Sequence, residues 1–281
     1  MDVRSLDVEG PDRHYHMSYT VFGSDDADRT IICVHGLTRN GRDFDLLAEA
    51  LAGDARVVCP DVVGRGQSAW LDDPEAYAMP TYIGHMLQLI QHLGVASVDW
   101  IGTSMGGLIG MGVATLENSP IERLVLNDVG PFLPKEALER IGAYLDLDLV
   151  FENLAQLESH LRQVHAPFGP LSNDQWAHLA AFSAKTRSDG KVVLGYDPNI
   201  AVPFMSEEVE DVDLWSFWDE IHCPTLLIRG AESDLLLEET AHEMTERGPR
   251  AMLVEFEGIG HAPALMADDQ IDRIKAWLDL E

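Results

Sequence analysis

Short runs of β-branched and apolar residues alternate with helical stretches along most of this 281-residue chain. The strand-like runs are "TIICVHG", "ARVVCPD", "VDWIGTS", "IERLVLNDVG", "CPTLLIRG" and "RAMLVEFEG". Strands that alternate with helices are typical of a mainly parallel sheet that is covered by helices on both faces. The sequence therefore predicts an α/β fold, preceded by an antiparallel hairpin over Val3–Val8 and His14–Phe22.

The alternation stops between Pro131 and about Glu220. This interval contains Trp176, Trp215 and Trp218, and its pattern is mostly helical. Helices are expected over Lys135–Asp146, Leu154–Val164 and Asp174–Ser183. A plain connection between two strands would be far shorter, so we expect a helical cap over residues 131–220. Residues 1–130 and 221–281 would then form the core on which the cap packs.

Composition restricts the classes of partner. The formal net charge is −29, from 48 acidic and 19 basic residues, which argues against nucleic acids and anionic membranes as partners. The same charge suits a salty habitat or an ordinary acidic cytosolic protein. The first ten residues lack the pattern of a secretory signal, and no apolar run is long enough for a membrane span. Three cysteines without CxxC spacing indicate free thiols in a reducing, cytoplasmic compartment, and no zinc site.

One serine lies between glycines where a strand becomes a helix, in "GTSMG" over residues 102–106. This G-x-S-x-G pattern in a strand–turn–helix context places a serine hydroxyl above the carboxyl ends of the strands. The helix that follows points its N-terminus at the same spot, which favours developing negative charge. Ser104 could also be a simple helix cap. The motif alone leaves both interpretations open.

A nucleophilic serine needs a base, and the base needs an orienting acid. His261 follows the last predicted strand, and Asp234 follows the strand before it, so the chain order is Ser, Asp, His. Glu232 in the same loop and Asp128 after "RLVLN" are rival acids. We favour Asp234 as the acid and expect Asp128 to be a cap or a structural anion.

Backbone N–H groups should form the oxyanion hole, one from Met105 and one from Leu37. His35, two residues before Leu37, is expected to hydrogen-bond loop backbone rather than act as a base. "PDVVGRGQS" lacks the third glycine of a dinucleotide-binding loop and is expected to form a tight turn.

Taken in order, "HGLTRNGRDF", "PDVVGRGQS", "GTSMGG", "RGAESDLL" and "GIGHAP" make the chain resemble the α/β-hydrolase superfamily over most of its length. The resemblance implies a serine nucleophile at Ser104, a general base at His261 and its acid at Asp234. It also implies oxyanion donors at Leu37 and Met105, a cap over residues 131–220, and no cofactor or metal.

The function expected from these features is hydrolysis of a small-molecule carboxylic ester, such as an ester of modest acyl size or a polyester oligomer. The apolar and tryptophan content of the expected cap indicates a pocket for a modest acyl or alkyl group. Arg39 or Arg65 could supply a local basic spot for an anionic substrate. Carbon–carbon hydrolases of the meta-cleavage type are an alternative, although they usually carry an aromatic residue where this chain has Ala262. An enol-lactonase, an acyltransferase and a ligand-binding member of the fold also remain open, as does the choice between monomer and homodimer.

Overall fold

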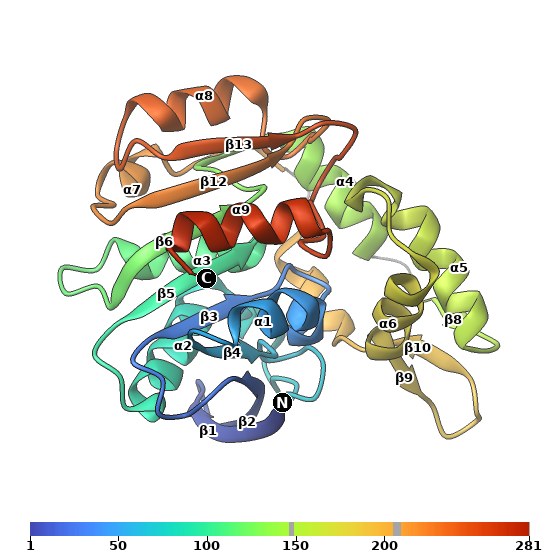
Figure 1. Cartoon of the computed structure of the whole chain (residues 1–281). Helices are drawn as coiled ribbons and strands as arrows, with labels where there is room; N and C mark the ends of the chain where they lie inside the picture. Colours follow the sequence, from blue (N-terminus) through green and yellow to red (C-terminus); the bar gives the residue numbers. More distant parts are fainter. Residues whose placement is uncertain (146–148, 205–208, 281) are drawn as a thin grey trace.

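An eight-stranded sheet forms the centre of the protein in the computed structural model, which describes residues 1–145, 149–204 and 209–280 (Figure 1). The strand order is β1-β2-β4-β3-β5-β6-β12-β13. β2 pairs antiparallel with β1 and with β4, and every other neighbouring pair is parallel. The predicted hairpin and the mainly parallel sheet are confirmed.

The strands of this sheet are β1 (Asp2–Glu9), β2 (His14–Phe22), β3 (Thr30–Val34), β4 (Arg56–Pro60), β5 (Val98–Thr103), β6 (Ile121–Asn127), β12 (Thr225–Gly230) and β13 (Met252–Phe256). The helices that pack on this sheet are α1 (Asp45–Leu51), α2 (Met79–Leu93), α3 (Met105–Ala114), α8 (Glu238–Glu246) and α9 (Asp268–Leu278). Two short 3-10 helices, η1 (Gly41–Phe44) and η2 (Pro74–Ala76), lie between β3 and α2.

Each face of the sheet carries its own apolar core, because successive side chains of a strand point to opposite faces. On β3, Ile32 and Val34 lie in a cluster with apolar residues of α2, α3 and α8. Ile31 and Cys33 lie in a second cluster with residues of α1 and α9. Figure 1 shows α1 and α9 together on the near face of the sheet. The helices thus cover both faces, as the uninterrupted apolar strands predict.

The chain between β6 and β12 leaves the sheet, and much of its described part forms a separate lobe beside the sheet (Figure 1). Its helices are α4 (Lys135–Leu145), α5 (Leu154–Val164), α6 (Asn173–Ser183) and α7 (Trp215–Asp219), with 3-10 helices η3 (Ala166–Phe168) and η4 (Pro198–Phe204). Its strands are β7 (Phe132–Leu133), β8 (Val150–Phe151), β9 (Ala184–Thr186), β10 (Val192–Leu194) and β11 (Val212–Asp213).

Three predicted helices correspond to α4, α5 and α6, except that Asp146 lies outside the described residues. The small sheet β8-β10-β9 was not predicted, because strands of two or three residues are too short to show a periodicity. α5, α6 and β10 share a third apolar cluster, to which Met266 contributes from the loop before α9. Trp218 of α7 packs instead into the core of the sheet. The lobe therefore has a core of its own, and the buried side chains of α4 and α7 lie outside it.

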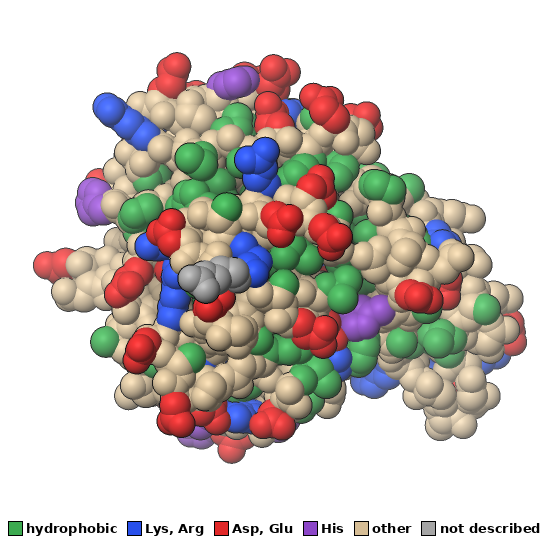
Figure 2. Space-filling model, in the orientation of Figure 1, with side chains coloured by type: hydrophobic (Ala, Val, Ile, Leu, Met, Phe, Trp, Pro, Cys, Tyr) green, Lys and Arg blue, Asp and Glu red, His purple; other side chains and the backbone are tan. Residues whose placement is uncertain are grey.

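Acidic side chains are scattered over the face shown in Figure 2, in keeping with the net charge of −29. Among the described residues, no helix is long and apolar enough to cross a membrane.

Candidate active site

The turn between β5 and α3 holds Ser104 in a conformation that L-residues seldom adopt, with φ 51° and ψ −116°. The glycines on either side permit close backbone approach rather than positive φ. A Cβ on Gly102 would lie 2.3 Å from the carbonyl oxygen of Gly106, and one on Gly106 would lie 2.0 Å from that of Val34. Backbone strain of this kind costs about 1–3 kcal/mol and persists only where the surroundings enforce it.

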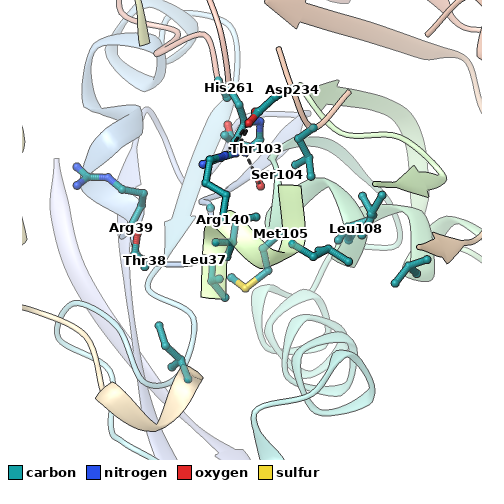
Figure 3. A pocket seen from close by; sticks show the side chains of 18 of the residues that line it. Leu37, Thr38, Arg39, Thr103, Ser104, Met105, Leu108, Arg140, Asp234 and His261 are labelled. Atoms are coloured by element: carbon teal, nitrogen blue, oxygen red, sulfur yellow. Dashed lines mark hydrogen bonds and ion pairs between the residues drawn. The ribbon is translucent and has the colours of Figure 1, made fainter. Parts of the chain in front are cut away.

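His261, in the loop after β13, lies against this serine. Its Nε2 is 3.0 Å from Ser104 Oγ, and its Nδ1 is 2.7 Å from Oδ2 of Asp128 (Figure 3 shows the Ser104–His261 pair). A carboxylate only accepts hydrogen bonds, so Nδ1 carries the proton and Nε2 is left to accept from the serine hydroxyl. This tautomer is the one in which a histidine can take a proton from serine.

Asp128 follows β6, the strand next to the one that carries Ser104. It is fully buried, and its φ of 58° turns the carboxylate beneath the His261 loop. The Gly230 N–H donates to Oδ1 at 2.8 Å, and the Ser233 hydroxyl donates to Oδ2 at 2.6 Å. Three donors thus satisfy the buried charge, as burial requires.

Asp234 does not contact His261, and its predicted role as the orienting acid is wrong in this structure. The loop after β12 directs Ser233 to Asp128, whereas Asp234 pairs with Arg140 of α4 at the pocket lining. The Asp234 side chain is 53% exposed. Glu232, the other rival in this loop, is exposed as well. Asp128, which we expected to be a cap or structural anion, occupies the position predicted for Asp234.

Leu37 and Met105, the two predicted oxyanion donors, both line the pocket that contains Ser104. Met105 is the first residue of α3, and Leu37 follows β3 in the loop beside it (Figure 3). Neither N–H donates a hydrogen bond to any residue that the structure describes. Both are therefore available to a negatively charged oxygen at the head of the pocket.

Two buried side chains fix the Leu37 loop. The Val62 N–H donates to His35 Nε2 at 3.0 Å, so His35 Nδ1 carries the proton and donates to the Gly36 carbonyl at 2.7 Å. Burial lowers the pKa of His35 to about 4, which keeps the ring neutral. Arg65 is also fully buried and donates to the Leu37 carbonyl at 2.7 Å. The structural role expected for His35 is confirmed, and Arg65 supports the loop rather than reaching a substrate.

A pocket of about 1000 Å³ lies over Ser104, between the sheet and the inserted lobe. Its walls are largely apolar and come from the loop after β3 and from α2, α3, α4, η3 and the segment before α7. The tryptophans expected to shape it do not line it. Trp176 packs in the lobe's own core and Trp218 in that of the sheet. The aromatic lining consists of Tyr77, Tyr82, Tyr144, Phe168 and Phe217.

Within the described ranges, no group of three histidine, cysteine or acidic side chains is arranged to hold a metal ion. Cys33 and Cys59 are buried in the sheet, and Cys223 is half-buried; all three are free thiols. The reactive groups that the pocket does present are the serine, the histidine and the N–H pair.

Comparison with known proteins finds a matching family model and several similar proteins. A family model described as the alpha/beta hydrolase fold matches residues 29–267. A 3-hydroxybutyrate-oligomer hydrolase from Cupriavidus necator is 47% identical over 265 residues, which cover 92% of this chain and 90% of that protein.

Two solved structures are also similar. A putative hydrolase from Rickettsia typhi has a TM-score of 0.94 at 34% identity, covering 99% of both chains. An α/β hydrolase from Novosphingobium aromaticivorans has a TM-score of 0.87 at 34% identity, covering 99% of this chain and 98% of that one.

Proposed function

Because the chain belongs to the α/β-hydrolase fold family and is a hydrolase, we propose that it cleaves carboxylic esters through an acyl-enzyme on Ser104. The observation that carries the proposal is the hydrogen-bonded series Ser104–His261–Asp128 at the head of a large apolar pocket. These residues meet the geometric requirements of a serine nucleophile, its base and the group that orients the base.

The first half of the reaction forms the acyl-enzyme. His261 Nε2 takes the proton of Ser104 as Oγ attacks the ester carbonyl carbon, and the Leu37 and Met105 N–H groups hold the resulting oxyanion. The bond from the carbonyl carbon to the alcohol oxygen then breaks, and His261 returns the proton to the leaving alcohol. Each oxyanion donor contributes about a hundredfold or more to the rate.

The second half releases the acid. His261 takes a proton from water as the water attacks the acyl-enzyme, and it then returns that proton to Ser104 Oγ. Asp128 holds the ring in its tautomer throughout and stabilises the imidazolium that forms in each half. The chemistry needs no group beyond the residues described.

For the substrate, we propose linear oligoesters of short hydroxy acids. The support comes from the 3-hydroxybutyrate-oligomer hydrolase, whose similarity covers nine-tenths of both chains. The lining of the pocket suits short aliphatic units, and its volume is at the upper end for small-molecule sites. In this proposal residues 131–220 act as the cap that closes the pocket from above.

We also propose a cytoplasmic setting, because free cysteines persist best in a reducing compartment. The partner is a small molecule, since the net charge of −29 opposes binding to nucleic acids and anionic membranes.

The proposal is tested by hydrolysis of p-nitrophenyl esters from acetate to decanoate and of the linear 3-hydroxybutyrate dimer. Wild type should cleave the short esters and the dimer, and Ser104→Ala should lose both activities. A fluorophosphonate should add its mass to wild type at Ser104 and leave Ser104→Ala unlabelled. Labelling at another residue, or turnover by Ser104→Ala, would refute the assignment of the nucleophile.

A further inference from the structure

We propose that Arg140, on α4 of the inserted lobe, binds the terminal carboxylate of the oligoester. This inference rests on the proposed function and adds to it a subsite for one end of the substrate. Arg140 and Ser104 line the same pocket, Arg140 from α4 of the lobe and Ser104 from the turn after β5. An oligoester whose terminal carboxylate is bound at Arg140 would therefore extend toward Ser104 and present an ester bond to it.

The other arginine in the pocket lining, Arg39, is already committed. Its Nε and Nη2 donate to the two carboxylate oxygens of Asp43, and its Nη1 donates to Ser183 Oγ at 2.9 Å. The residue is only 6% exposed, and Figure 3 shows its guanidinium directed away from Ser104. Arg39 thus joins α6 to the core, and all three nitrogens of its guanidinium are engaged in hydrogen bonds within the protein.

Arg140 differs from Arg39 both in its hydrogen bonds and in its exposure. Its Nε and Nη2 donate to Asp234 at 2.6 and 2.9 Å, and its Nη1 donates to no residue that the structure describes. The side chains are 45% and 53% exposed, and ion pairs this exposed contribute little to stability. A substrate carboxylate can therefore add at Nη1 or replace Asp234 in the fork. The bidentate contact shows that a carboxylate fits the fork.

Tyr144 provides a second donor, one turn further along α4. Residues four apart lie on the same helix face, and both Arg140 and Tyr144 line the pocket. The Tyr144 hydroxyl makes no hydrogen bond with the rest of the described chain. Burial raises its pKa to about 12, so it remains a hydroxyl donor at neutral pH. A guanidinium and a hydroxyl on one helix face form a site for an anion.

Among the pocket residues that the structure describes, the charges favour an anionic end at this subsite. Two other acidic residues at the pocket lining, Glu210 and Glu232, are exposed and repel a carboxylate from their part of the opening. His165 and His261 also line the pocket, and burial holds the pKa of His165 well below its usual value, so His165 adds no positive charge. In this proposal Arg140 supplies the positive charge that recognises the acid end, and Tyr144 adds a neutral donor.

The subsite determines which ester bond of the oligoester is cleaved, because a carboxylate held at Arg140 brings an ester bond near the carboxyl end to Ser104. The polarity of the oligoester fixes the leaving group: whichever ester bond is attacked, the alcohol released on acylation is the portion that carries the carboxyl terminus. The remainder stays on Ser104 as the acyl group until water releases it.

The test compares two forms of the linear 3-hydroxybutyrate dimer, the free acid and its terminal N-methyl amide. Each has one ester bond, and they differ in the charge at the end, so chromatography of the products gives kcat/KM for each. Wild type should prefer the acid, and Arg140→Gln should lower the acid-to-amide ratio by about tenfold to a hundredfold. Arg140→Lys should give an intermediate ratio, because it keeps the charge and loses the fork. Asp234→Asn should lower KM for the acid, because it removes the competing carboxylate.

Arg187→Gln is the matched control. Arg187 is 49% exposed and pairs with Asp189 on the same lobe, but it does not line the pocket. The control should keep the wild-type ratio. If Arg140→Gln also keeps it while both dimers are cleaved, the subsite is refuted and the proposed function stands. If wild type cleaves neither dimer, the oligoester function itself fails and the subsite with it.

Discussion

Replacing Asp128 by asparagine tests the assignment of the acid most directly. The carboxylate uses both oxygens, one for the Gly230 N–H and the other for Ser233 and His261. An amide offers one oxygen only. If its NH2 faces His261, the ring must accept at Nδ1 and carry its proton at Nε2, where it can no longer accept from Ser104. If its NH2 faces Gly230, a buried N–H loses its acceptor at a cost of about 1–3 kcal/mol.

Both orientations also lose the negative charge that stabilises the imidazolium. Together these losses predict that kcat/KM for p-nitrophenyl butyrate falls about 10³- to 10⁴-fold, or about 4–5.5 kcal/mol of transition-state stabilisation. Asp234→Asn should lose less than about tenfold, because Asp234 is paired with Arg140 and does not touch His261. Circular dichroism and thermal unfolding will show whether the two variants are folded. A thousandfold loss in Asp234→Asn, with less than tenfold in Asp128→Asn, would refute the geometric argument.

Three further predictions concern stability. Gly106→Ala should destabilise the fold by about 3 kcal/mol or more, because its Cβ would lie 2.0 Å from the Val34 carbonyl oxygen. Gly53→Ala, which meets nothing within 4 Å, is the control in thermal unfolding, and equal midpoints would contradict the close-packing argument. For His35 the folded pKa is about 4 and the unfolded value is about 6.5, so the unfolded chain binds the extra proton between these pH values. Its contribution of about 3 kcal/mol should be complete above pH 6.5 and lost as the pH falls to 4, and urea unfolding of His35→Gln should show a smaller slope over that window. Added salt should raise the thermal midpoint by screening the net charge of −29, and a midpoint that is flat with salt would contradict this.

The sequence was sufficient to predict the sheet, Ser104 and His261. Residues that directly follow parallel strands lie together at the carboxyl edge of the sheet, and both Ser104 and His261 follow such strands. It was not sufficient to choose between Asp128 and Asp234, which lie at similar heights on neighbouring strands. The choice depends on backbone direction, namely the φ of 58° at Asp128 and the turn that points Ser233 inward. The glycine spacing indicates the elbow, but no local pattern reports where an acidic side chain points.

The walls of the pocket were harder to predict for a related reason. Helices α4 to α6 could be predicted from their periodicity, but their packing on the sheet could not. The tryptophans therefore gave a misleading indication of the pocket lining. Nothing in the sequence pattern indicated that Arg140 lines the pocket. A charged residue on an amphipathic helix has the same pattern whether it faces bulk water or a substrate.

The separate core of the inserted lobe has a consequence for how such an enzyme can change over generations. Residues of α5, α6 and β10 pack mainly with one another, and substitutions among them leave the two cores of the sheet intact. Drift in the lobe can therefore reshape the specificity of the enzyme while the serine elbow stays under strict constraint. Libraries that recombine the lobe between relatives should keep the nucleophile reactive and vary in the esters they accept.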